Sequence, residues 1–309
     1  MEQNIRNLVV GYDFSPAARH ALEAAASLAD RLGAGLVVAT SIHGALDDRI
    51  LSQLEADTAE GHEKLESRAV LYERVQSLVR ESVGALDTRG VALRFDVGEA
   101  PPVDHLTQAA SNGEGDVICV GTVGNYEPPP GHLVGLDAER LARRSVLPVL
   151  VVHPRSPFPP ETILVPVDFS DASERAFGQA LDFARLYGSK LVALHVVDIG
   201  ASRVQSIVGA FRPKGYAEAA VALGGDELDA FIARFELGDV RIERLVVEGR
   251  PATVVVDTAR DRAADLICIG AVGRNAFVDS LVGGTTSRVL AQAPCSVMAV
   301  KPDAYALRS

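Results

Sequence analysis

Cysteine, long apolar stretches and positive charge are all scarce in this chain of 309 residues. Three cysteines without a CxxC pair argue against both a disulfide framework and a zinc site. Cys119 and Cys268 stand inside the apolar runs DVICVG and DLICIG, where a small core residue is expected. We therefore interpret both as core residues and not as reactive thiols.

No apolar run approaches the ~20 residues needed to span a bilayer. The N-terminal sequence MEQNIRNLVVGYDFS lacks the basic region, apolar segment and cleavage site of a signal peptide. The formal net charge of −11 disfavours nonspecific binding to nucleic acid or to an anionic membrane. We therefore expect a cytoplasmic protein that has neither as a partner. A nucleotide is compatible with this charge, because backbone N–H groups at a helix N-terminus can hold phosphate without lysine.

The chain does contain one pattern written twice. NLVVGYDFSPAARHALEAAASLADRLG begins at Asn7, and TILVPVDFSDASERAFGQALDFARLYG begins at Thr162. Later in each copy, GDVICVGTVG corresponds to ADLICIGAVG. At ~150 residues per domain, a chain of this length with such a repeat predicts two domains. We place them at residues 1–153 and 162–309, with the proline-rich segment 154–161 as the linker.

Each copy alternates short apolar strands with amphipathic helices. The first expected helix has an apolar face at three- and four-residue spacing, formed by Ala18, Ala21, Leu22, Ala25, Leu28, Ala29 and Leu32. This alternation predicts a doubly wound, Rossmann-like α/β domain with five parallel strands in each copy. The final strands, LPVLVVH and CSVMAVK, would be apolar sheet edges if left open. We therefore expect the two copies to pack as a pseudo-dimer.

Two segments are interpreted as insertions. Residues 47–86 are highly charged with apolar residues at helical spacing, which favours a helix lying on the sheet. Residues 202–225 have the length and glycines of a flexible cover near the second site. A partner surface and an ordinary loop followed by a helix are the alternatives for that segment.

These motifs together resemble the universal stress protein family in its tandem form, over nearly the whole chain. The resemblance rests on VVGYDFS and VPVDFS, LHVVD, EGRPA, DLICIG and the G-x2-G-x9-G pattern that begins at Gly270. In nucleotide-binding members, the aspartate after the first strand and the backbone of the second strand flank adenosine, and the glycine loop wraps the phosphates. Other members lack the loop and bind no ATP.

The resemblance implies a site for ATP or a related adenine nucleotide in the second copy, with magnesium as a companion of the phosphates. The residues carried over to this site are Pro166, Asp168, Val196, Gly270, Gly273, Gly283, Gly284, Thr285 and Thr286. In open α/β sheets, ligands bind at the carboxyl ends of strands where the strand order reverses, and Gly270 ends a strand. Gly270 and Gly273 permit close backbone approach and positive φ, and Thr285 can cap the next helix. A turn that only joins a strand to a helix is the alternative.

Both copies depart from the family motif. In the second, Gly284 stands where the motif has serine or threonine, so Thr285 or Thr286 would supply the hydroxyl one step later. In the first, ten residues instead of nine separate the second and third glycines, and three prolines remove amide donors. There Leu136 and Asp137 replace the small hydroxyl residues. A carboxylate at a helix N-terminus competes with phosphate, so we expect the first copy to bind ATP poorly or not at all. A simple anionic cap is the other interpretation of Asp137.

Several other polar residues have two interpretations. Asp13 and Asp168 either order a helix cap together with Ser15 and Ser170 or contact adenosine, and for Asp13 we favour the cap. His195 in LHVVD is interpreted as a satisfied strand histidine. The remaining candidates, His43, His132 and His153, have no carboxylate or cysteine at metal-ligand spacing, so we expect no metal held by protein side chains alone.

The function expected from these features is that of a stress-response regulatory protein. It would bind ATP or a related adenine nucleotide in the second domain, with at most slow hydrolysis and no catalytic residue. We also expect a homodimer and a protein partner of unknown identity. The alternative is a tandem interaction scaffold that binds no nucleotide. An adenylating or pyrophosphatase enzyme is disfavoured, because the chain shows no phosphate-binding signature with a catalytic cation or acid.

Overall fold

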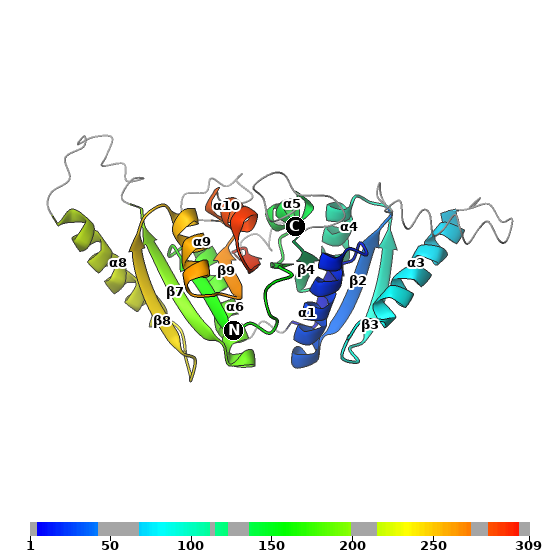
Figure 1. Ribbon diagram of the computed structural model, residues 1–309, viewed down its shortest axis with the longest axis horizontal. Helices are drawn as coiled ribbons and strands as arrows, with labels where there is room; N and C mark the ends of the chain where they lie inside the picture. The colour runs from blue at the N-terminus through cyan, green and yellow to red at the C-terminus, as the bar shows by residue number, and fades with distance from the viewer. Residues whose placement is uncertain are drawn as a thin grey trace. The chain divides into compact units, whose positions relative to one another are not determined.

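The computed structural model describes residues 5–42, 68–111, 115–122, 136–198, 215–272 and 284–302. The chain divides into two compact units, with a boundary between Pro154 and Arg155. In the described residues, each unit contains five parallel strands alternating with helices (Figure 1). This confirms the predicted doubly wound α/β class.

The first unit has the strand order β3-β2-β1-β4-β5. Its strands are β1 (Asn7–Gly11), β2 (Gly35–Ser41), β3 (Leu93–Gly98), β4 (Val117–Gly121) and β5 (Val149–Val152). Its helices are α1 (Pro16–Leu32), α3 (Arg68–Gly84), α4 (Pro102–Ala109) and α5 (Leu136–Arg144). Helix α1 packs on β1, β2, β4 and β5, whereas α4 packs on α5 and on β1 and β2.

The second unit repeats this order as β8-β7-β6-β9-β10. Its strands are β6 (Thr162–Val167), β7 (Lys190–Val197), β8 (Ile242–Glu248), β9 (Leu266–Gly270) and β10 (Ser296–Val300). Its helices are α6 (Asp171–Tyr187), α8 (Tyr216–Ile232), α9 (Pro251–Asp261) and α10 (Gly284–Gln292). Helix α6 packs on β6, β9 and β10, α8 packs on β7 and β8, and α9 packs on α10.

The inner strands of each unit are apolar without alternation because helices cover both of their faces, whereas β3 and β8 carry charged residues and are only partly buried. In β6, the consecutive residues Ile163, Leu164 and Val165 are completely buried. The predicted face of α1 is buried from Ala18 to Ala29, but Leu32 is 36% exposed and does not belong to it. The helix ends one residue later at Gly33, whose left-handed conformation (φ 64°) closes it.

In both units, an aspartate carboxylate holds the amino ends of two neighbouring strands together by hydrogen bonds. In the first unit, Asp116 Oδ2 accepts hydrogen bonds from the backbone N–H groups of Arg6 (2.7 Å) and Asn7 (3.1 Å). In the second, Asp265 Oδ2 accepts from Glu161 (2.8 Å) and Thr162 (3.0 Å). Each carboxylate therefore ties the amino end of the fourth strand of its unit to that of the first.

The proline-rich segment predicted as a linker contacts the second unit. The hydroxyl of Ser156 accepts a hydrogen bond from the Ser296 N–H group (3.0 Å), and Ser189 donates to the carbonyl of Pro160 (2.6 Å). Phe158 also makes an edge contact with Tyr187, at 5.8 Å between ring centroids. The segment is therefore fastened to the body that follows it.

The two predicted insertions are partly described. Within residues 47–86, α3 forms the predicted helix and buries Val75, Val79 and Val83 against β3, whereas residues 47–67 lie outside the described residues. Within residues 202–225, the part from Tyr216 onward is the start of α8, as the interpretation of a loop followed by a helix predicts for this part, and residues 202–214 lie outside the described residues. None of the described helices has the length and apolar character needed to cross a bilayer.

Candidate functional site

The strands β6 and β9 separate before they end. Their ladder joins Ile163 to Leu266 and Leu164 to Ile267, whereas the ladder between β6 and β7 continues to Val167 and His195. Pro166 lies beyond the part of β6 that pairs with β9. The N–H group that proline lacks is therefore not needed for a hydrogen bond to β9. This point is also where the strand order reverses, which is where ligands bind in open α/β sheets.

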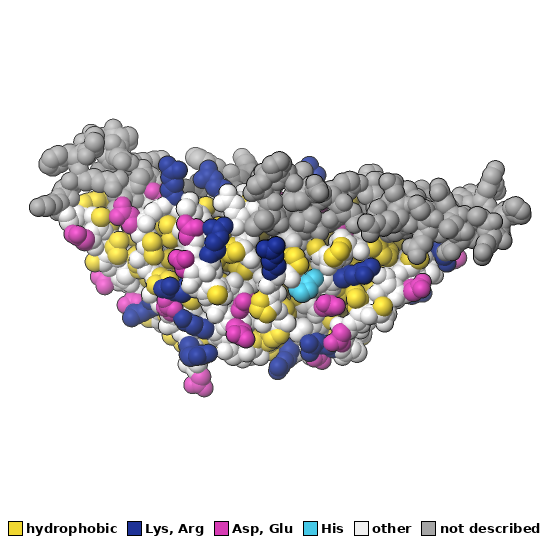
Figure 2. Space-filling model, viewed as in Figure 1, with side chains coloured by type: hydrophobic (Ala, Val, Ile, Leu, Met, Phe, Trp, Pro, Cys, Tyr) yellow, Lys and Arg dark blue, Asp and Glu magenta, His cyan; other side chains and the backbone are white. Residues whose placement is uncertain are grey.

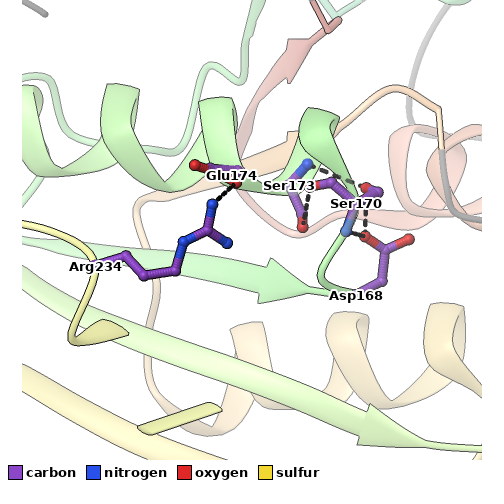
Figure 3. A network of polar contacts seen from close by, with 5 residues as sticks. All are labelled: Asp168, Ser170, Ser173, Glu174 and Arg234. Atoms are coloured by element: carbon purple, nitrogen blue, oxygen red, sulfur yellow. Dashed lines mark hydrogen bonds and ion pairs between the residues drawn. The ribbon is translucent and has the colours of Figure 1, made fainter. Parts of the chain in front are cut away.

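Asp168 follows β6 and orders the turn into α6 (Figure 3). Its Oδ1 accepts hydrogen bonds from the backbone N–H (3.1 Å) and the hydroxyl (2.5 Å) of Ser170. Ser170 Oγ in turn accepts from the Ser173 N–H group (3.2 Å) as the N-cap of α6. This confirms the cap interpretation of Asp168, while its contact with adenosine stays a prediction.

The first unit repeats this turn. Asp13 Oδ1 accepts from the Ser15 N–H group (3.0 Å), and Ser15 Oγ caps α1 by accepting from Ala18 (3.1 Å). The residue after each aspartate has a left-handed backbone, with φ 66° at Phe14 and 63° at Phe169. The aspartate turns alone therefore do not distinguish the two units.

Gly270 is required by the packing of α6. A Cβ atom at this position would lie 2.9 Å from the Ala172 carbonyl carbon and from the Ser173 nitrogen. The close approach predicted for Gly270 therefore occurs, but the approaching group is a helix backbone. The predicted positive φ is wrong for Gly270, because its backbone lies outside the left-handed region.

Gly284 begins α10 and has space around it. A Cβ atom there would meet nothing within 4 Å, and its φ is not positive. Packing among the described residues therefore does not require glycine at this position, and a serine would fit. The other two loop glycines of the prediction, Gly273 and Gly283, lie outside the described residues.

The two threonines of α10 differ in their environment. Thr286 is buried, and its hydroxyl donates a hydrogen bond to the carbonyl of Gly270 (2.8 Å). Thr285 is half-buried. Because α10 begins at Gly284, Thr285 stands inside the first turn, and the prediction that it caps the helix is wrong. The hydroxyl of Thr286 therefore joins the start of α10 to the end of β9.

The corresponding helix of the first unit, α5, has different chemistry in its first turn. Asp137 and Glu139 place two carboxylates there, whereas the first turn of α10 has no acidic residue. Asp137 is exposed and pairs with Arg140 at 3.4 Å, while its role as an anionic cap of α5 stays a prediction. Ala138 occupies the place of Thr286, and the hydroxyl link to the preceding strand is lost.

His195 and Val196 lie near the end of β7, and His195 contacts the Asp168 turn. His195 Nδ1 lies 2.8 Å from the carbonyl oxygen of Val167, which confirms the interpretation of a satisfied strand histidine. Val196 pairs with Val247 of β8 and is half-buried. Of the other histidines, His153 is buried after β5, while His43 and His132 lie outside the described residues.

Buried ionisable groups were largely missed by sequence reasoning. Lys301 directly follows β10, is only 2% exposed, and burial lowers its pKa to about 8. Its carbonyl accepts a hydrogen bond from Arg175 (2.6 Å). Cys119 and Cys268 are completely buried, and this burial raises the pKa of both thiols, to about 12 for Cys119. The core interpretation of these cysteines is confirmed.

Surface charges of both signs are interspersed on the face drawn in Figure 2. Among the described residues of the second unit, many charged side chains form ion pairs. Glu243 contacts Lys190 and Arg262, and the hydrogen bond from Lys190 holds the pKa of this carboxyl below its usual value. Because the fields of two paired opposite charges largely cancel at a distance, we expect attraction of an anion to this unit to depend on local groups such as helix N-termini.

The strand order and the crossing helices define a doubly wound, Rossmann-like α/β fold, with the candidate site at the point where the strand order reverses. The model of the universal stress protein family matches the chain twice, over residues 4–153 and 160–301. The chain therefore belongs to the universal stress protein family and carries two of its domains in tandem.

Individual relatives agree with this assignment. A universal stress protein of Mycolicibacterium smegmatis is 28% identical over 237 residues, which cover 74% of this chain and 75% of that protein. One from Mycobacterium tuberculosis is 33% identical over 188 residues, or 59% of this chain and 60% of the relative. Among solved structures, a universal stress protein from Archaeoglobus fulgidus superposes with a TM-score of 0.61 and 18% identity, and 97% of each chain is covered.

Proposed function

We propose that the second unit binds ATP or a related adenine nucleotide and that the protein is a stress-response regulator with at most slow hydrolysis. The observation that carries this proposal is the first turn of α10. It contains no acidic residue and is linked through Thr286 to the end of β9, close to the point where the strand order reverses. A helix N-terminus of this kind attracts phosphate through its N–H groups and its dipole.

The residues divide into two groups in this proposal. Pro166, Asp168 and Val196, at the ends of β6 and β7, are assigned to adenosine. Backbone N–H groups from Gly270 to Gly284 and the hydroxyl of Thr285 are assigned to the phosphates, with magnesium as their companion. The hydroxyl of Thr286 donates to Gly270 and therefore supports the phosphate site by holding the helix start in place.

The helix α6 is a poorer candidate for binding an anion. Ser170 caps one of its first N–H groups, that of Ser173, and Asp171 and Glu174 bring negative charge into its first turn. Glu174 pairs with Arg234 at 2.6 Å, as Figure 3 shows. The contrast with α10 supports placing the phosphates at α10.

A pair of charge exchanges tests the proposal. Thr285→Asp gives α10 the carboxylate that α5 has at Asp137, and Asp137→Thr is the matched reverse change in the first unit. Titration calorimetry of the full chain with ATP should show about a tenfold loss of affinity for Thr285→Asp, because the new carboxylate repels phosphate. The affinity of Asp137→Thr should equal that of the wild type. Equal affinity in all three proteins would refute the phosphate assignment.

An interaction scaffold that binds no nucleotide is the second candidate function. The observation that favours it is Gly284, which lacks the hydroxyl of the family motif. Acid extraction of the purified chain followed by anion exchange separates the two candidates. The absence of extracted nucleotide, together with no heat on addition of ATP, would favour the scaffold. A homodimer and a protein partner remain predictions, and sedimentation equilibrium of the full chain tests the first.

A further inference from the structure

His195 contacts the turn that carries Asp168 through a hydrogen bond. Its Nδ1 lies 2.8 Å from the carbonyl oxygen of Val167, the residue directly before Asp168. A carbonyl oxygen only accepts hydrogen bonds, so Nδ1 carries the proton and donates it. The bond therefore ties the side chain of β7 to the last residue of β6.

The same imidazole ring also contacts the residue directly after Asp168. The rings of His195 and Phe169 lie 4.5 Å apart between centroids, with an interplanar angle of 35°. Phe169 has a left-handed backbone (φ 63°), which is uncommon for a residue with a side chain. An edge contact with Phe231 of α8, at 5.8 Å between centroids, supports its ring on another side.

Helix α8 limits the space available to the imidazole ring. A Cβ atom at Gly224 would lie 3.0 Å from His195 Cδ2, so glycine at this place in α8 lets the helix approach the ring. His195 is thus held between β6, the Asp168 turn and α8, and it contacts both neighbours of Asp168. Its own freedom to move is correspondingly small.

The first unit has a corresponding hydrogen bond between its second and first strands, but the donor is a hydroxyl group and not an imidazole ring. Thr40 corresponds to His195 in the repeat, and its hydroxyl donates to the carbonyl of Tyr12 (2.9 Å), directly before Asp13. Phe14 contacts Tyr12, at 5.3 Å between ring centroids. The link between the second and first strands is therefore common to both units, and the imidazole contact is particular to the second.

We propose that His195 is a positioning residue for the nucleotide site. By holding Val167 and Phe169, it fixes the backbone and the carboxylate of Asp168 in the orientation needed to contact adenosine. The proposal rests on the proposed function, because it gives His195 a role in a site that the second unit is proposed to have. His195 itself does not touch the nucleotide in this scheme.

Three variants of the full chain test the proposal. His195→Asn places an N–H donor at the position of Nδ1 but removes the ring, and His195→Phe keeps a ring but removes the donor. Thr40→Val removes the corresponding bond from the first unit and is the matched control. Circular dichroism and thermal unfolding verify that each variant is folded.

The first readout is ATP affinity by titration calorimetry. Loss of the donor in His195→Phe should weaken binding about tenfold, whereas His195→Asn should stay within about threefold of the wild type. Thr40→Val should leave affinity unchanged. The proposal is overturned if the asparagine variant binds as weakly as the phenylalanine variant, or if both bind as the wild type does.

The second readout needs no nucleotide. The Ser170 N–H group donates to Asp168 Oδ1, so its amide hydrogen exchange reports on the order of the turn. Exchange should be about tenfold faster in His195→Phe and near the wild-type rate in His195→Asn. Unchanged exchange in His195→Phe would overturn the positioning role. If the wild type binds no ATP, the proposed function fails, and this exchange experiment still decides whether His195 orders the turn.

Discussion

The helices α5 and α10 begin at corresponding places in the two units, but their first turns differ in charge. The first turn of α5 carries Asp137 and Glu139, and that of α10 carries no acidic side chain. A carboxylate satisfies a helix N-terminus from within the chain, whereas a first turn without one keeps its dipole available to an external anion. Among the described residues, this comparison supports the proposal that phosphate binds in the second unit, because the first turn of α10 has no carboxylate.

Other features are the same in both units, and these features support the fold. The carboxylates of Asp116 and Asp265 fasten the starts of the sheets, and Ser15 and Ser170 cap the first helices. Differences at corresponding positions occur in the first turns of α5 and α10, at Thr40 and His195, and at His153 and Lys301. The two units therefore share a framework and differ at several positions, which include the candidate site.

The largest expected loss of stability comes from replacing Gly270 and Gly121, which occupy corresponding positions in the two units. A Cβ atom at Gly270 would lie 2.9 Å from the α6 backbone, and one at Gly121 would lie 2.6 Å from the α1 backbone at Ala17. We expect Gly270→Ala and Gly121→Ala each to lower the free energy of unfolding by about 2–4 kcal/mol, because two main chains must separate. Urea unfolding measures this loss. Gly284→Ala, where the Cβ meets nothing, is the control, and an equal loss there would contradict the packing argument.

The next effect concerns Lys301, which corresponds to His153 in the first unit. Its pKa is lowered from 10.5 to about 8 by burial, so between these pH values the unfolded chain binds more protons than the folded one. Stability contributed by this group therefore rises as pH increases from about 8 to 10.5. Lys301→Met should remove that rise and stabilise the protein at pH 7 by about 2 kcal/mol. Parallel pH curves for wild type and variant in chemical unfolding would show that burial of the charge is not costly.

A smaller effect should follow from the hydroxyl that links α10 to β9. Thr286→Val removes the hydrogen bond to the Gly270 carbonyl and leaves a partly buried acceptor without that donor, at a cost of about 1 kcal/mol. Ala138→Thr introduces the same hydroxyl into the first unit. Thermal unfolding compares the two variants with the wild type. A Thr286→Val protein as stable as the wild type would show that the bond contributes nothing to the helix start.

The smallest effect should come from restoring the hydroxyl of the family motif. Gly284→Ser places a donor in open space at the start of α10, and we expect ATP affinity to increase a few-fold. The corresponding change in the first unit, Leu136→Ser, should have no effect, because the two carboxylates of α5 remain. Titration calorimetry measures both. Tighter ATP binding by Leu136→Ser would indicate that the first unit binds the nucleotide, which contradicts the proposal.

Local patterns allowed the fold to be predicted, because strands, helix faces and caps depend on neighbouring residues. The buried face of α1 and the serine caps follow from spacing and side-chain chemistry within a few residues. The prediction that Leu32 belongs to the buried face was wrong. The helix ends beside it at Gly33 and leaves its side chain exposed, which periodicity alone does not show.

The details of the candidate site were less accessible to sequence reasoning. The reason for Gly270 is the backbone of α6, about a hundred residues earlier in the chain, and the partner of Thr286 is a carbonyl group that carries no side-chain signal. The contact of His195 with Phe169 depends likewise on strand register and on a left-handed turn. These three contacts depend on tertiary packing, which local sequence patterns do not show. The repeat was the available indication, because it places different residues at corresponding positions of the two copies.

The most direct test of the central claim is the stoichiometry of ATP binding to the full wild-type chain, measured by titration calorimetry. The difference between α5 and α10 predicts one ATP per chain, bound by the second unit. Two equivalents per chain, or none, would contradict the account.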